Sequence, residues 1–119
     1  MSSVKTHKDL EIWQRGIDFV EQVYRMTRDF PKEELYGLTS QIRRAAVSYP
    51  SNIAEGAARS SKKEYVKYLY ISLASVSEVE TQLMIAQRLG YTKVDHELHE
   101  IEALRRMTLS FIKYLKSKE

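Results

Sequence analysis

The residues from Asp9 to Asp29 repeat apolar side chains at the spacing of an α-helix, and they do so along two separate seams. The first seam consists of Leu10, Trp13, Ile17, Val20 and Tyr24. The second seam, displaced around the helix, consists of Ile12, Phe19, Val23, Met26 and Phe30. Together the seams cover roughly 200° of the circumference, whereas a stripe that faces one core needs only about 100°. The segment is therefore predicted to be a helix that buries more than one face.

Start and stop signals divide the chain into four predicted helices, over residues 9–29, 33–58, 61–89 and 94–116. The first ends at Phe30-Pro31, because the residue before a proline disfavours the helical conformation. Ser61-Lys-Lys-Glu64 is a capping box for the third helix, and Gly90 is the small residue expected just after its end. Pro50 falls inside the second helix, which we therefore expect to be kinked.

The composition narrows the fold class further. The 119 residues include only 4 Gly and 2 Pro, which permits long helices and argues against a turn-rich β fold. There is no Cys, so a disulfide framework, a thiolate zinc site and a thiol nucleophile are excluded. No run of about 18 apolar residues and no apolar signal core is present, so we expect a cytoplasmic protein. Because the connections are short, we expect a single domain over residues 1–119: an all-α, antiparallel up-down-up-down four-helix bundle with a Pro-kinked second helix.

The excess apolar surface of the first helix predicts self-association. One bundle interior cannot cover both seams, and exposed apolar patches of that size mark contacts between molecules. We expect the oligomer interface to contain four residues of the second seam: Ile12, Phe19, Val23 and Met26. The alternative is a broad, aromatic-rich core that leaves some apolar atoms exposed.

Charge is distributed unevenly along the chain, whose net charge is only +3. Residues 43–67 carry six basic and two acidic side chains, a net charge of +4, whereas residues 93–102 carry one basic and four acidic side chains, a net charge of −3. Basic side chains neutralise phosphates, and repetition around an oligomer makes a modest patch multivalent. The candidate nucleic-acid-binding residues are Arg43, Arg44, Arg59, Lys62, Lys63 and Lys67. Tyr65 and Tyr68 are interleaved with them.

Two charged residues interrupt the apolar stripes, Glu80 in the third predicted helix and Arg105 in the fourth. An unpaired buried charge is costly, so each needs a partner. We expect the two to pair with each other, or to join a polar network with Asn52 or Arg43. Since Asn52 and Glu55 supply polar groups beside the proline kink, the predicted structural network contains Asn52, Glu55, Glu80 and Arg105.

Catalytic and metal-binding signals are weak. His96-Glu-Leu-His99 makes two imidazoles neighbours on a helix, but both fall away from its apolar face, and the Glu-x-x-His motif of di-iron bundles is missing. Seven residues separate Arg88 from His96, which does not match the Arg-x4-6-His spacing of a helical ribonuclease. A metal-binding bundle is thus a remote alternative. We expect no cofactor, no metal and no catalytic residue, so that the protein is not an enzyme.

Several motifs resemble those of one bacterial family, the four-helix bundle proteins encoded in intervening sequences of 23S ribosomal RNA genes. The resemblance covers essentially the whole chain. The motifs that carry it are Asp9-Leu-Glu-Ile-Trp13, Leu38-Thr-Ser-Gln-Ile-Arg-Arg-Ala-Ala-Val-Ser48, Pro50-Ser-Asn-Ile-Ala-Glu-Gly56, Glu64-Tyr65, Leu73-Ala-Ser-Val-Ser-Glu-Val-Glu80 and Ala86-Gln-Arg-Leu-Gly90. Two departures are visible: Tyr49 stands where an aliphatic residue is usual, and Ala74-Ser75 where Gly-Ser is common.

The resemblance implies a homopentameric, barrel-like assembly of antiparallel bundles. It also implies similarity to the accessory variability determinant of diversity-generating retroelements, a basic pentamer that binds nucleic acid and a reverse transcriptase. We therefore expect a non-catalytic oligomer that binds RNA or DNA through its basic segment, with no membrane partner. The alternative is a scaffold that binds only proteins, in which the charges serve solubility.

Overall fold

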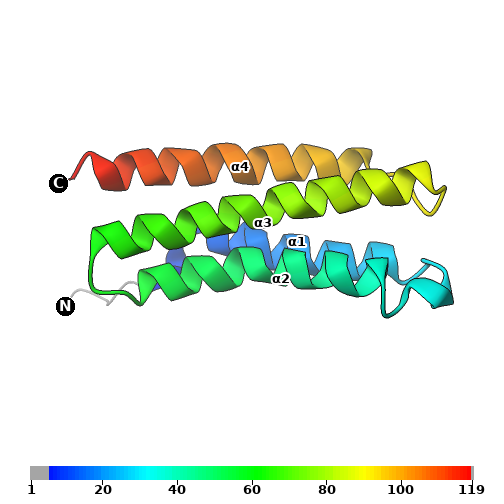
Figure 1. The fold of residues 1–119 in the computed structure, drawn as a ribbon. Coiled ribbons are helices and arrows are strands. Elements are labelled where there is room, and N and C mark those ends of the chain that lie inside the picture. Colours follow the sequence, from blue (N-terminus) through cyan, green and yellow to red (C-terminus); the bar gives the residue numbers. More distant parts are fainter. Residues whose placement is uncertain (1–5, 119) are drawn as a thin grey trace.

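The computed structural model describes residues 6–118, which form four long helices and two short 3₁₀ turns. In chain order the elements are η1 (His7–Asp9), α1 (Glu11–Thr27), η2 (Lys32–Glu34), α2 (Leu38–Ala57), α3 (Lys62–Arg88) and α4 (Asp95–Lys116). The molecule is a rod of 50 × 26 × 21 Å, and successive helices run in opposite directions along it (Figure 1). The all-α, antiparallel four-helix fold that the sequence predicts is confirmed.

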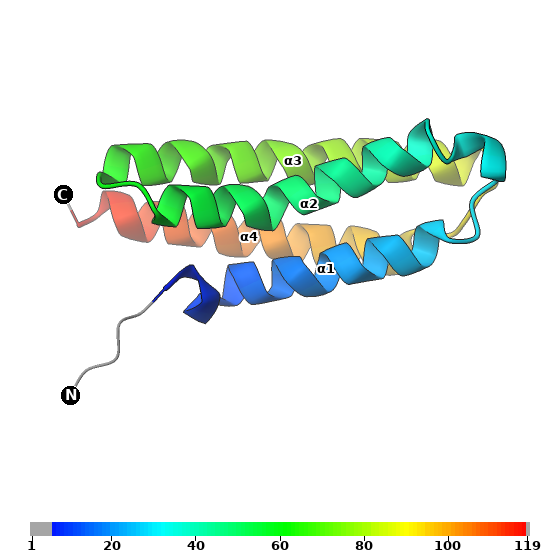
Figure 2. The same ribbon diagram turned by 90° about the horizontal axis from the view of Figure 1, so that it is seen from below.

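The four helices surround one core. α1 packs against α2 and α4, and α3 packs against the same two helices, so that the bundle has α1 and α3 at opposite corners (Figures 1 and 2). The turn between α2 and α3 and the carboxyl end of α4 lie at one end of the rod, while the α1–α2 and α3–α4 connections lie at the other. Within the described range, none of the helices has the length and hydropathy needed to cross a membrane.

The second helix starts later than predicted. It was expected from residue 33, but residues 32–34 form the η2 turn and α2 begins at Leu38. Gly37 precedes it with backbone angles of φ −116° and ψ −112°, which interrupt the helical path. The carboxylate of Glu34 reaches back and accepts a 3.1 Å hydrogen bond from the Leu38 amide, so it caps α2 in place of an N-cap side chain. That bond, together with a second from the Tyr91 hydroxyl, lowers the pKa of Glu34.

The predicted N-cap residue and the predicted stop glycine of α3 are confirmed, whereas the reciprocal bond of the predicted capping box, from the Ser61 amide to the Glu64 carboxylate, is not found among the described residues. The Ser61 hydroxyl accepts a hydrogen bond from the Glu64 amide at 3.1 Å, as an N-cap residue does. Gly90 has a φ of +80°, and the Tyr91 amide donates to the Ala86 carbonyl, the closing bond of a Schellman motif. Pro50 lies buried inside α2, which continues through it to Ala57.

The predicted oligomer interface lies inside the bundle, which corrects that assignment. Phe19 and Val23 are at most 1% exposed, Ile12 is buried, and Met26 is partly buried against the core. The reason is geometric, because α1 sits between α2 and α4 and presents its second seam to both of them. Ile12, Phe19 and Val23 are therefore core residues that a single chain covers, and Met26 packs at the edge of that core.

The first seam of α1 is the one that the bundle covers incompletely. Leu10, Trp13 and Val20 are partly buried, whereas Ile17 is 43% exposed and Tyr24 is 40% exposed. A shallow groove between α1 and α2 is lined by Trp13, Ile17, Val20, Val47, Pro50 and Ser51. α1 does expose apolar side chains, as the sequence predicts. They belong to the first seam, however, and not to the second seam, which was predicted to form the interface.

Candidate nucleic-acid interface

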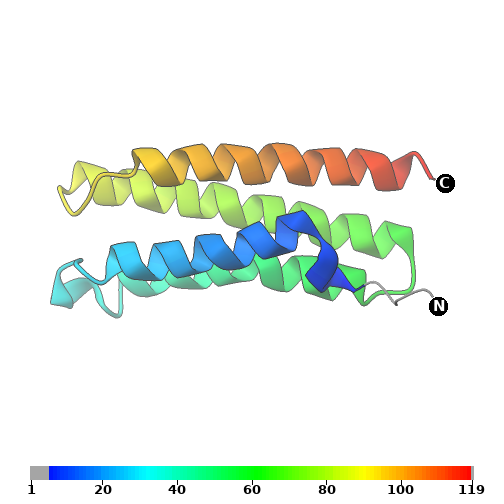
Figure 3. The ribbon, with the colours of Figure 1, turned by 180° about the vertical axis from the view of Figure 1, so that it is seen from behind.

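Four of the six predicted nucleic-acid contacts lie together at one end of the rod. Arg59 follows α2, and Lys62, Lys63 and Lys67 occupy the first turns of α3, all of them exposed. The antiparallel fold brings the last turns of α4 to the same place, and these add Lys113 and Lys116, followed by Lys118 just after the helix (Figures 1 and 3). We call these seven residues the basic end.

The two halves of the basic end are in direct contact, since the Lys62 ammonium donates a hydrogen bond to the Lys118 carbonyl. Residues 55–67 and 113–118 together carry the seven basic side chains and two acidic ones, Glu55 and Glu64, which is a net charge of +5. The acidic segment 93–102 lies at the far end of the 50 Å rod. Charge is thus polarised along the long axis.

Arg59 is held by three contacts at the basic end. Its guanidinium donates to Glu55 at 2.7 Å and to the Tyr68 hydroxyl at 2.8 Å, and it lies over the Tyr68 ring at 4.9 Å. The pair with Glu55 joins positions i and i+4 of neighbouring turns and stays largely exposed. Arg59 is therefore oriented while it still presents charge to solvent.

Arg43 and Arg44 are separate from the basic end. Arg44 precedes the end of α2 by thirteen residues, roughly 20 Å of helix. The Arg43 guanidinium donates to Thr27 Oγ1 at 2.9 Å and to the Tyr24 carbonyl, and it lies over the Tyr24 ring at 4.6 Å. These bonds tie α2 to the last turn of α1, so Arg43 has a structural role in a contact with α1 and not in the network with Glu80 and Arg105 that was one of the sequence-based alternatives.

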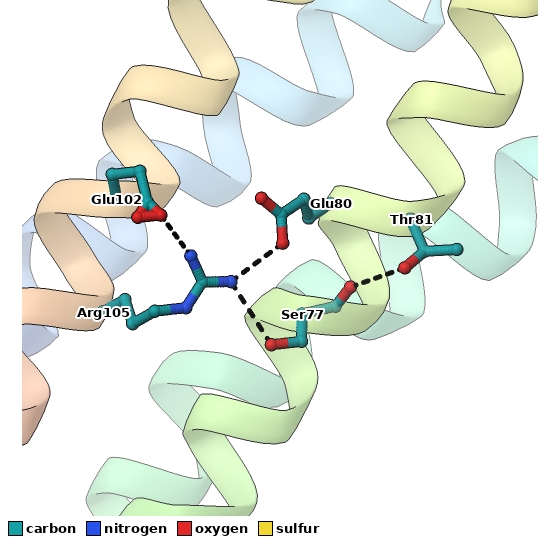
Figure 4. A network of polar contacts seen from close by, with 5 residues as sticks. All are labelled: Ser77, Glu80, Thr81, Glu102 and Arg105. Carbon is teal, nitrogen blue, oxygen red and sulfur yellow. Dashed lines mark hydrogen bonds and ion pairs between the residues drawn. The ribbon is translucent and has the colours of Figure 1, made fainter.

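The predicted pair of Glu80 and Arg105 is present and joins α3 to α4 (Figure 4). The Arg105 guanidinium donates to Glu80 at 2.9 Å, to Ser77 Oγ at 3.3 Å and to Glu102 one turn earlier on its own helix. The side chains of Arg105 and Glu80 remain 25% and 33% exposed. The cluster is thus a half-solvated clamp between two helices rather than a buried charge pair.

Asn52 and Glu55 do not belong to that cluster, which corrects the single network predicted from the sequence. The Asn52 amide donates to the carbonyl and to the hydroxyl of Ser48, both at 2.9 Å, and Ser48 shares a 2.8 Å bond with Ser75 of α3. Glu55 pairs with Arg59. The Asn52 group acts as a separate polar link between α2 and α3 near Pro50.

One ion pair between helices was not predicted from the sequence. Arg15 of α1 forms a two-pronged hydrogen bond with Glu100 of α4, at 3.0 and 3.2 Å, and this bond raises the pKa of Arg15. Arg15 and Glu100 both lie on the polar face of their helix, so the apolar periodicity gives no sign that they meet. Their contact depends on the packing of α1 beside α4.

The two histidines of α4 are exposed, and His99 Nδ1 lies 3.0 Å from the Asp95 carbonyl. The part of the chain that the structure describes contains no group of three His, Cys, Asp or Glu side chains arranged to hold a metal ion.

The helices and the charge pattern define a small antiparallel four-helix bundle protein that is basic at one end. The chain belongs to the 23S rRNA-intervening sequence protein family, whose family model matches residues 8–110. The fold is similar to a crystal structure from Bacteroides thetaiotaomicron, described as a protein of unknown function from the S23 ribosomal protein family, with a TM-score of 0.61 and 20% sequence identity. That match covers 89% of this chain and 95% of the other, and at this identity it concerns the fold alone. No curated protein matches the sequence.

Proposed function

We propose that this protein binds RNA or DNA through its basic end, as an assembly of several copies and without catalysing a reaction. The supporting observation is the meeting of two segments, distant in sequence, in one surface of net charge +5. Basic side chains displace the counterions condensed on a phosphate backbone, which favours binding at low salt and weakens it as salt rises. The acidic far end would repel the same ligand, so the molecule would bind end-on.

Self-association would support this function, because each further copy adds another basic end, and one basic end alone has only a modest charge. The groove between α1 and α2 exposes Ile17 and Val47 beside Trp13, which is apolar surface suited to a contact between copies. Copies joined through this face would present several basic ends to one nucleic acid and gain affinity by multivalency. The family resemblance suggests five copies. A scaffold that binds only proteins is the second candidate, because the same apolar groove could receive another protein.

The test is a salt titration of binding to a structured RNA, with two double variants matched in charge change. Lys63→Glu with Lys113→Glu alters the basic end, and Lys32→Glu with Lys93→Glu alters the far end; all four lysines are exposed. We expect the first variant to weaken binding and to reduce the slope of log K against log salt by about two, and the second to change neither. An absence of binding at low salt, or equal effects of both variants, would contradict the proposal and favour the protein scaffold.

A further inference from the structure

Four aromatic residues lie in a row across the basic end, and the rings of three of them are in contact. Tyr114 and Phe111 of α4 are stacked with their centroids 6.2 Å apart, and Phe111 meets Tyr65 of α3 edge to face at 5.6 Å. Tyr68 lies one turn further along α3, and its Cβ and the ring of Tyr65 both face Gly56 of α2. Figure 2 shows α1 beginning short of this end, so the first turns of α3 and the last turns of α4 extend past it.

The row keeps ring surface in contact with solvent. Tyr114 is 54% exposed, and Phe111, Tyr65 and Tyr68 are half-buried. Gly56 at the end of α2 makes room for the row, since a Cβ there would lie 2.9 Å from Tyr68 Cβ and 3.0 Å from Tyr65 Cδ1. Core packing accounts for the inner rings, but it does not account for an outer ring that is more than half exposed.

Cations lie over the rings at both ends of the row. Lys118 Nζ is 5.2 Å from the Tyr114 centroid, while Arg59 and Lys67 are 4.9 and 5.9 Å from the Tyr68 centroid. With Lys116 over Tyr70, four of the five cation–π contacts found among the described residues belong to the basic end. Aromatic faces and phosphate-binding charges are therefore concentrated on the same surface.

We propose that this row stacks unpaired bases, so that the ligand of the basic end is single-stranded nucleic acid or a single-stranded loop. The inference rests on the proposed function and names its substrate class. In a duplex the bases stack on one another and only phosphates and groove edges reach a protein, whereas a single strand also offers the faces of its bases. A base that stacks on Tyr114 or Tyr68 releases the cation from the ring, and that cation then pairs with the neighbouring phosphate.

The experiment measures fluorescence anisotropy of labelled oligonucleotides of about ten nucleotides, a length within the usual site size of such grooves. Single-stranded RNA, single-stranded DNA and the corresponding duplexes are titrated at several salt concentrations. We expect the single strands to bind about tenfold more tightly than the duplexes. Tyr114→Leu should weaken single-strand binding by about tenfold, leave duplex binding unchanged and leave the salt slope unchanged, because stacking releases no counterions.

Two variants serve as controls. Tyr114→Phe keeps the ring and should bind like the unaltered protein, which separates stacking from loss of the hydroxyl. Tyr36→Leu removes a tyrosine that is 94% exposed at the far end, and it should have no effect. Tyr68→Leu repeats the test at the other end of the row, and a thermal melt verifies that each variant is folded.

The outcomes distinguish the two proposals. Equal binding of single strands and duplexes, with Tyr114→Leu unchanged, overturns the stacking inference and leaves phosphate binding by the basic end intact. A failure of every oligonucleotide to bind at low salt overturns both. A loss with Tyr114→Leu that is matched by Tyr114→Phe also overturns the inference, since the ring would then be irrelevant.

Discussion

The ring of Tyr49 packs against the backbone of Gly16, so closely that a Cβ at residue 16 would lie 2.8 Å from both Cδ2 and Cε2 of the ring. Tyr49 is wholly buried, and it reaches the other two helices as well. Its hydroxyl shares a 2.8 Å hydrogen bond with Thr108 of α4, and its carbonyl accepts one from Ser72 of α3 at 2.9 Å. One residue of α2 thereby contacts each of the other three helices.

Gly16→Ala should destabilise the protein by roughly 1–3 kcal/mol, the usual cost of forcing extra atoms into a packed core. Alanine is the better helix former by about 1 kcal/mol, so a net loss would show that the contact with Tyr49 dominates. Denaturation by urea measures the change. The same substitution in a Tyr49→Leu background should cost less, because the smaller side chain leaves room. A stabilising Gly16→Ala would show that the two helices separate easily at this crossing.

The clamp between α3 and α4 predicts a modest coupling between Glu80 and Arg105. Glu80→Ala leaves Arg105 its bonds to Glu102 and Ser77, and solvent reaches both partners, so we expect a coupling energy of about 0.5–1 kcal/mol. Glu80→Ala should lower the melting temperature, and Glu80→Ala with Arg105→Met should recover much of the loss. A double-mutant cycle measures the coupling.

The surface pair of Arg25 and Glu21, whose side chains are far more exposed, is the matched reference for that cycle and should show almost no coupling. Full additivity of the changes at Glu80 and Arg105 would mean that their contact contributes nothing to stability.

The helices and the charge polarity were predictable from the sequence, because the period of apolar residues and the spacing of charges are local properties. Which of its two apolar seams a helix such as α1 turns toward the core is not a local property of the sequence. Both seams of α1 fit a core equally well, and only the positions of α2 and α4 decide that Phe19 and Val23 point inward while Ile17 does not.

The basic end was predictable only in part, because the sequence pattern groups only those basic residues that are close together along the chain. Arg59, Lys62, Lys63 and Lys67 are close together in sequence, whereas Lys113, Lys116 and Lys118 join them only through the antiparallel return of α4. Nothing in the local pattern marks Arg43 as tied to Tyr24 and Thr27, because that contact belongs to the packing of two helices.

Burial of Tyr49 predicts a loss of stability at alkaline pH. Burial raises the pKa of Tyr49 from its ordinary value near 10 to about 12, against smaller lowering effects from Thr108 and Arg15. Between about pH 10 and about pH 12 the unfolded chain releases this proton and the folded chain keeps it. Unfolding therefore becomes more favourable as pH rises, by roughly 2–3 kcal/mol over the whole range. Below about pH 10 the contribution is fully present.

Urea denaturation from about pH 9 to about pH 12 tests that dependence, and Tyr49→Phe is the control. The variant should lose about 1 kcal/mol at neutral pH with the hydrogen bond to Thr108, and it should show a shallower decline at alkaline pH. Tyr65, whose pKa burial also raises, remains in the variant and preserves part of the slope. Identical slopes for both proteins would assign the alkaline loss to other tyrosines.

Under the proposed self-association, the exposed seam of α1 is the surface that we expect to join copies of the chain. Ile17→Glu should reduce the mass measured by light scattering while leaving the folded subunit intact, because Ile17 is 43% exposed in the single chain. Ile85→Glu, an isoleucine of similar exposure on α3, is the matched control and should leave the mass unchanged. Phe19→Glu should instead unfold the subunit, since it places a charge in the core. A single-chain mass for the unaltered protein would contradict self-association through this seam, and it would leave the basic end to bind nucleic acid without multivalency.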